Sequence, residues 1–165
     1  MSYKTNLTGQ NVASFYCLIG EAIWMIQHLE EALSHSITIK NDVKYPRRIS
    51  EEEAKGSLER YRSLSLDNAI NFANNNNLYS DILYNDLAVF KKERDWLVHK
   101  LLRNNFEDMH AAPTRNRLFH RIKAISNKAN MLQKAIEVDL IQFSEAVGMN
   151  LPTVHAATRQ YFHED

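Results

Sequence analysis

Arg94 and His99 stand five positions apart in a segment that begins at Lys91 and reads KKERDWLVH. Histidine can accept or donate a proton near neutral pH. Arginine offers a planar fork of N–H donors that matches the oxygens of a phosphate and stabilises negative charge on them. Together the two residue types indicate acid–base chemistry on a phosphate ester.

The position of Arg94 in its helix is unusual. A helix is predicted over about 79–103, and its apolar residues recur on one face at Leu83, Leu87, Phe90, Leu97 and Leu101. Arg94 falls where the next apolar residue of this face belongs, and a charge there is costly unless it is paired or lines a cleft. The alternative is that Arg94 pairs with Glu93, Asp86 or a partner helix, and that His99 is a half-buried histidine with satisfied hydrogen bonds.

Helix geometry limits what one copy of this motif can do. Five residues of a regular α-helix turn the chain by about 500°, so Arg94 and His99 point about 140° apart. A symmetric dimer with this helix at the interface brings an arginine and a histidine from each subunit into one cleft. Asp95 lies four residues before His99 on the same face, where its carboxylate can orient the imidazole and raise its pKa. Arg94, His99 and Asp95 are therefore the predicted catalytic residues.

The segment resembles the signature of the HEPN superfamily. In that signature an arginine is followed by a polar residue and then by a histidine after four to six positions, often as Glu-Arg-Asn-x-Leu-x-His. The residues that match are Glu93, Arg94, Leu97 and His99. Asp95 stands where asparagine is commonest, and the resemblance covers the chain best from Tyr79 to Val147.

The resemblance implies a fold and an activity. The expected fold is all-α, an up-down four-helix bundle with short additional helices. The expected activity is that of a metal-independent endoribonuclease, which cleaves RNA by attack of the 2′-hydroxyl and leaves a 2′,3′-cyclic phosphate. No cofactor is expected. The resemblance also implies a homodimer in a toxin–antitoxin or phage-defence system, with an antitoxin or a nucleotidyltransferase as a possible partner.

A second segment has the same spacing. Arg115 and His120 are also five positions apart, and Asn116 follows the arginine as in the commonest form of the signature. This copy lies at the start of the predicted helix 114–147, whereas the family motif usually has a long helix still to follow. Placement therefore favours Arg94 and His99, and Arg115 and His120 are expected to contact RNA phosphates if both helices line one cleft.

The charge of the chain is unevenly distributed. It has 20 basic and 20 acidic residues, but nine of the basic and four of the acidic ones lie between Lys91 and Lys123, a local excess of +5. Such a segment attracts a polyanion. The predicted RNA-binding residues are Lys91, Lys92, Lys100, Arg103, Arg115 and His120. The alternative is an ordinary solvated helix face.

Two other functions fit the same residues. One is a HEPN-like helical domain that binds RNA or a partner protein without cleaving, since Asp95 beside Arg94 weakens anion binding and the net charge is zero. The other is a plain helical adaptor in which the Arg–His spacing is accidental.

A single domain, 1–165, is expected. The chain has only four glycines and three prolines, which favours long helices. The predicted helices lie at about 11–39, 50–74, 79–103 and 114–147, with a short one at 152–162. Ser50 and Glu53 form a capping box in this prediction, and the asparagine run 74–77 forms a turn.

Other sites and a membrane location are not expected. His28, Glu31 and His35 share a helix face, but no second helix offers matching ligands, so no metal site is predicted. Cys17, with apolar neighbours, is predicted to be buried. The N-terminus is polar, and no apolar run approaches the roughly 20 residues of a membrane span, so the prediction is a cytoplasmic protein.

Overall fold

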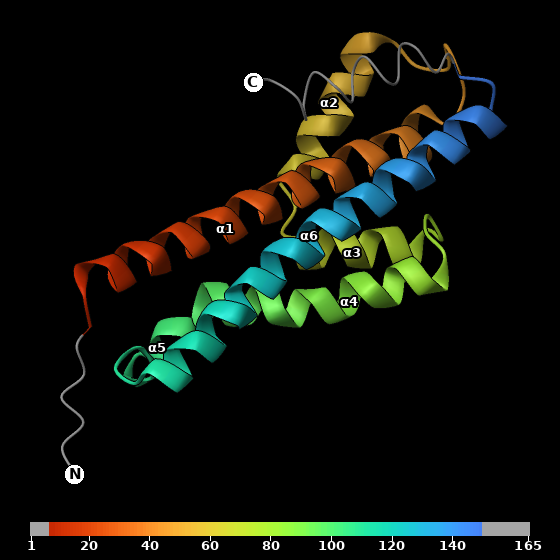
Figure 1. Ribbon diagram of the computed structural model, residues 1–165. Coiled ribbons are helices and arrows are strands. Elements are labelled where there is room, and N and C mark those ends of the chain that lie inside the picture. The colour runs from red at the N-terminus through yellow and green to blue at the C-terminus, as the bar shows by residue number, and fades with distance from the viewer. Residues whose placement is uncertain (1–6, 150–165) are drawn as a thin grey trace.

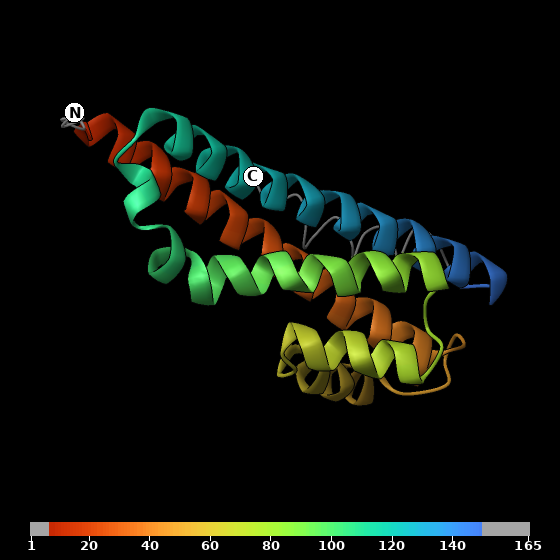
Figure 2. The ribbon, with the colours of Figure 1, turned by 90° about the horizontal axis from the view of Figure 1, so that it is seen from below.

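A computed structural model describes residues 7–149, and every regular element in this range is helical, which confirms the predicted all-α class for these residues. The elements are α1 (Gly9–Ile37), η1 (Thr38–Val43), α2 (Glu51–Arg62), α3 (Leu66–Asn75), α4 (Asp81–Asp95), η2 (Trp96–Lys100), α5 (Leu101–Asn105), η3 (Glu107–Met109) and α6 (Ala112–Ala146). Helices α1 and α6 lie side by side, α4 runs along them, and α2 and α3 lie beside the C-terminal part of α1 (Figures 1 and 2).

Side-chain contacts fix the directions of the long helices. From one end to the other, α6 contacts α1 through ring stacking of Phe15 on Phe119 and an ion pair of Glu21 with Lys123, and it contacts η1, which continues α1, through an ion pair of Lys40 with Asp139. Residue numbers rise together along both helices, so α1 and α6 are parallel. Helix α4 runs the opposite way against α6, since Asp86 pairs with Lys128 and Glu93 with Arg121.

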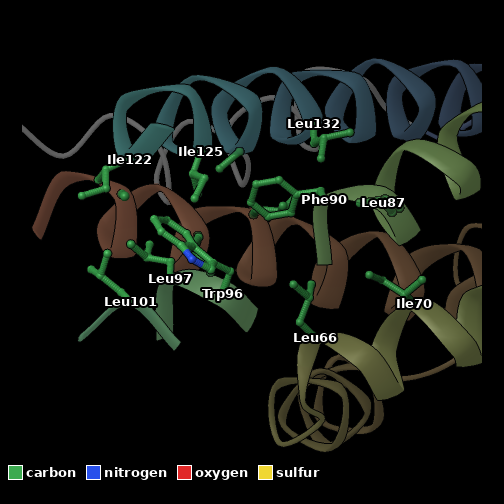
Figure 3. Packing of buried hydrophobic residues seen from close by; sticks show 14 of the residues in the cluster. Leu66, Ile70, Leu87, Phe90, Trp96, Leu97, Leu101, Ile122, Ile125 and Leu132 are labelled. Atoms are coloured by element: carbon green, nitrogen blue, oxygen red, sulfur yellow. The ribbon is translucent and has the colours of Figure 1, made fainter. Parts of the chain in front are cut away.

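The apolar faces of α1, α4 and α6 meet in one core. Its fully buried side chains include Leu29, Leu33, Leu87, Phe90, Ile122 and Ile136. Figure 3 shows Leu87 and Phe90 of α4 in the same cluster as Ile125 and Leu132 of α6. The apolar face predicted for 79–103 is confirmed, because all five of its residues are buried.

Several predicted helix boundaries are confirmed by local hydrogen bonds and backbone angles. Ser50 and Glu53 form the capping box at the start of α2. Of the asparagine run predicted to form a turn, Asn76 and Asn77 do so after α3, with a φ of 52° at Asn77, whereas the first two asparagines end the helix; Gly148 follows α6 with a φ of 73°. Both angles are left-handed, which asparagine and glycine tolerate best.

The structure differs from the prediction in three helices. The range 50–74 is two helices, because α2 ends at Arg62 with Ser63 as its C-cap and Ser65 caps α3 by accepting from the amide of Asn68. Helix α1 starts at Gly9, capped by Thr8, and passes at Thr38 into the π-helical turn η1. The range 79–103 is interrupted by a second π-helical turn, η2. The predicted helix 152–162 lies outside the described residues.

Cys17 is exposed, so the prediction that it is buried was wrong. The buried face of α1 contains Phe15, Ala22 and Ile26. Cys17 follows Phe15 by two residues, which turns it about 200° away from that face. Trp24 is exposed for the same geometric reason.

One long stretch has enough length and hydropathy to cross a membrane, which corrects the expectation that none does. This stretch, Gly9–Val43, has a mean hydropathy of 1.2 in its most apolar window. The core helix of a soluble protein meets the same criteria.

Lys40 joins three segments at one end of the molecule. Its ammonium donates to Asp139 of α6 at 2.5 Å and to the carbonyl oxygen of Leu78, and its side chain is only 9% exposed. Replacing Lys40 with methionine leaves the carboxylate of Asp139 without its cation, so we expect a loss of about 2–3 kcal/mol of unfolding free energy. Thermal and urea unfolding measure this loss.

The matched control for this prediction is Lys55→Met. Lys55 pairs with Glu51 on the surface of α2, and its side chain is 73% exposed. An exposed pair of this spacing contributes about 0.5 kcal/mol or less. Equal stability of the two variants would contradict a structural role for the Lys40 pair.

Candidate functional site

Arg94 lies at the end of α4 with its charge paired. Its Nη1 donates to Oδ1 of Asp95 at 3.2 Å, and its Nη2 lies 3.6 Å from Oε1 of Glu30 on α1. The side chain is 23% exposed, and its buried Nε has no hydrogen-bond partner among the described residues. Neither of the two acids considered as partners from the sequence pairs with Arg94, because Glu93 binds Arg121 and Asp86 binds Lys128.

Glu30 makes the surroundings of Arg94 acidic. Burial raises the pKa of Glu30, and the positive charge of Arg94 offsets part of that effect. The guanidinium therefore lies between two carboxylates, those of Glu30 and Asp95, in a half-buried cluster. An anion that binds Arg94 has to compete with both.

The π-helical turn η2 begins two residues after Arg94 and contains His99. In such a turn each backbone amide bonds to the carbonyl five residues back, so one more residue fits into the turn than in an α-helix. Trp96 and Leu101 are five residues apart and both buried, as this geometry requires. Figure 3 shows both side chains in the core cluster. Because a π-helical turn holds more residues per turn than an α-helix, we expect the angle between Arg94 and His99 to be smaller than the 140° of a regular helix.

His99 is exposed to solvent. Its imidazole makes no hydrogen bond or ion pair within residues 7–149, and the carboxylate of Asp95 bonds to Arg94 instead. The predicted orientation of His99 by Asp95 is thus not present as a hydrogen bond in this part of the chain. The ring nitrogens are accessible for proton transfer to a bound molecule.

The second Arg–His pair has different surroundings. Arg115 is half-buried and donates to the backbone carbonyl of Met109 at 3.1 Å, while His120 is exposed on α6. The hydrogen bond of Arg115 ties the loop before α6 to its first turn. No contact among the described residues brings this pair to Arg94 or His99.

The other predicted RNA-binding residues differ in whether their charges are already paired. Lys91 pairs with Asp67 of α3 at 2.6 Å, and this contact raises the pKa of Lys91. Lys92, Lys100 and Arg103 are exposed. These three cations make no ion pair with the residues that the structure describes, so they are available to a polyanion.

His28, Glu31 and His35 do not form a metal cluster. Glu31 accepts hydrogen bonds from His35 and from Arg62 of α2, which occupies its carboxylate. Within 7–149 no group of three or more histidine, cysteine, aspartate or glutamate side chains is placed to hold a metal ion.

Sequence reasoning missed three residues near the Arg–His segment. Glu30 belongs to another helix, and nothing in the sequence indicates that it meets Arg94. Arg117 and Arg121 line a pocket beside Trp96, where the guanidinium of Arg121 stacks 3.6 Å from the centre of the indole ring. Their spacing of four residues in the basic segment was the available signal.

Compared with models of known protein families, with curated proteins and with solved structures, the chain gives no match.

Proposed function

We propose that this protein is a HEPN-type endoribonuclease that cleaves RNA without a metal ion. The observation that carries the proposal is the π-helical turn that begins two residues after Arg94 and contains His99. Such turns occur frequently at functional sites, and this one reduces the angle between the two side chains while His99 stays exposed. In the proposed reaction His99 transfers the protons, and Arg94 stabilises the charged phosphorane.

The finer fold belongs to the same proposal. We assign the four helices of a HEPN-like bundle to α1, to α2 with α3, to α4 continued by η2 and α5, and to α6. Because α1 and α6 are parallel, the order of these four helices differs from the simple up-down order expected from the resemblance. In this assignment the motif lies at the end of the third helix with one long helix still to follow. The position of the motif in the order of the helices therefore agrees with the family resemblance.

The active form in this proposal is a homodimer. Three large apolar side chains are exposed around one end of α1 and α5: Tyr16 at 68%, Leu102 at 66% and Phe106 at 64%. They border an apolar pocket of about 200 Å³ that is lined also by Phe15 and Leu101. Exposed apolar surface of this kind favours protein association. Leu102 follows His99 by three residues, so a second copy packed here lies close to the histidine.

The test of the proposed function is an RNA cleavage assay in EDTA. Purified protein is incubated with single-stranded RNA, and the new 3′ ends are analysed. Products that end in a 2′,3′-cyclic phosphate support attack by the 2′-hydroxyl. Intact RNA at high protein concentration, or products with a free 3′-hydroxyl, would count against the proposal.

A non-catalytic HEPN-like domain that binds RNA or a partner protein is the second candidate. The observation in its favour is the pairing of Arg94 with two carboxylates, which reduces the charge available to a phosphate. In this case RNA binds in a salt-dependent manner and is not cleaved.

Replacing Glu30 with glutamine is expected to strengthen RNA binding about fivefold. The change keeps the size of the side chain and removes one negative charge beside Arg94, which corresponds to about 1 kcal/mol at an intermediate effective dielectric constant. Filter binding or fluorescence anisotropy gives the dissociation constant. The control is Glu52→Gln, which removes the same charge from an exposed position on α2. Equal affinities of the two variants would show that Glu30 does not restrain Arg94.

A further inference from the structure

A polar pocket lies on the α6 side of η2. Its volume is about 270 Å³, and its lining comprises Trp96, Asn105, Asp108, Thr114, Arg117, Leu118 and Arg121. Trp96 and Leu118 are buried, so the pocket has an apolar base and a polar rim.

Hydrogen bonds hold one side of the rim in place. The indole Nε1 of Trp96 donates to Oδ1 of Asn105 at 3.2 Å, and the amide nitrogen of Asn105 donates to Oδ2 of Asp108 at 2.6 Å. The hydroxyl of Thr114 donates to the backbone carbonyl of Asp108 at 2.8 Å. Because these groups bind one another, η3, which contains Asp108, is fixed against the start of α6.

The opposite side of the rim has unused donors. Arg121 uses Nε and Nη2 on the carboxylate of Glu93 and stacks on Trp96, which leaves its Nη1 without a bond within residues 7–149. Arg117, one helical turn earlier and exposed, makes no hydrogen bond or ion pair in the described part of the chain. Two guanidinium groups on one helix face can share a phosphate.

The fixed side offers an acceptor. Oδ1 of Asp108 accepts no hydrogen bond from the described residues, whereas Oδ2 is bound by Asn105. A carboxylate oxygen beside two arginines repels a bare anion but accepts from a hydroxyl group. A pocket with donors on one side and an acceptor on the other is complementary to a phosphate joined to a sugar.

We propose that this pocket binds one nucleotide of a single-stranded RNA, with its phosphate on Arg117 and Arg121 and its ribose 2′-hydroxyl on Asp108. The choice of RNA as the polymer rests on the proposed function. The lining of the pocket and its hydrogen bonds do not depend on that proposal. The 2′-hydroxyl distinguishes RNA from DNA, and in this proposal the carboxylate of Asp108 accepts a hydrogen bond from it. The pocket adjoins Trp96, two residues after Arg94, so a strand bound here is held beside the Arg–His segment.

The test measures binding apart from cleavage. All proteins carry His99→Ala to prevent turnover and Trp24→Phe so that Trp96 is the one remaining tryptophan. Ligands are a short single-stranded RNA, a DNA of the same sequence, a nucleoside monophosphate and inorganic phosphate, and Trp96 fluorescence reports occupancy. Arg117→Ala is expected to weaken RNA binding about tenfold, the effect of one charge-assisted hydrogen bond. Circular dichroism verifies the fold of each variant.

The matched control is Arg48→Ala, which removes an exposed arginine from the segment between η1 and α2. Unchanged affinity in this variant together with the loss in Arg117→Ala supports the pocket. Equal losses of RNA affinity in both variants would mean that Arg117 contributes only general electrostatic attraction, which would overturn the proposal. DNA or inorganic phosphate binding as tightly as RNA would overturn the role of Asp108 and the nucleotide assignment.

The two proposals fail separately. If the enzyme with an intact His99 cleaves RNA and Arg117→Ala neither binds nor cleaves less well, the nucleotide pocket is wrong and the proposed function stands. If Arg117 governs RNA binding and no RNA is cleaved, the pocket stands and the ribonuclease assignment is wrong.

Discussion

Replacing His99 with alanine is expected to lower the rate of RNA cleavage in EDTA by about 10²–10⁴-fold, the usual contribution of a general acid or base. His99 is exposed and makes no hydrogen bond within residues 7–149, so its removal leaves the core intact. Arg94→Ala is expected to have a comparable effect on cleavage. The rate of product formation at saturating RNA measures the chemical step.

The controls for this prediction come from the second Arg–His pair. His120→Ala removes an exposed histidine of α6 and is expected to retain most of the activity. Full activity in His99→Ala combined with its loss in His120→Ala would transfer the catalytic assignment to the second pair. Arg94→Ala also removes the cation between Glu30 and Asp95, so its unfolding free energy has to be measured beside its activity.

Mixing two inactive subunits is expected to restore cleavage. When Arg94→Ala and His99→Ala chains are co-expressed with different tags, half of the dimers combine one chain of each kind. In a shared cleft, each active pair combines the arginine of one subunit with the histidine of the other, and such a mixed dimer keeps one of its two pairs intact. Because half of the dimers are mixed, the mixture recovers about a quarter of the wild-type rate. No recovery in purified mixed dimers would mean that each subunit uses its own Arg94 and His99.

The recovery of RNA cleavage requires the dimer, so it is expected to depend on the apolar surface near α5 through which the dimer is proposed to form. Adding Leu102→Asp to both chains introduces a charge among Tyr16, Leu102 and Phe106, and it is expected to weaken the dimer about 100-fold and to abolish the recovery. Val89→Asp is the control, because Val89 is an exposed apolar residue of α4 that does not line this pocket. Light scattering gives the oligomeric state of each variant. A wild-type monomer that cleaves RNA would exclude the shared cleft.

The sequence was sufficient for much of the helical architecture. The regular spacing from Leu83 to Leu101 determined which face of α4 is buried, and Ser50 with Glu53 determined where α2 begins. These features depend on residues close together in the chain. Local spacing therefore predicts them without knowledge of the rest of the fold.

The surroundings of Arg94 were less predictable. Its partner Glu30 lies on a helix that is distant in the sequence, and the contact depends on how α1 and α4 are placed against each other. The π-helical turn was hidden because Leu97 and Leu101 also fit a regular helix. The adjacent apolar pair Trp96 and Leu97 was the sign that two rows of side chains are buried there.

The π-helical turn also changes the meaning of residue counting in the Arg–His motif. A helix that gains one residue in such a turn keeps its two flanking segments in place, because the widened loop of backbone absorbs the insertion. Because His99 lies inside the turn, only part of this shift reaches it, and its direction falls between those of the fourth and fifth residues after Arg94 in an unbroken helix. Chains with different numbers of residues between the arginine and the histidine can thus present the same surface, and a search by fixed spacing alone separates proteins whose geometry is alike.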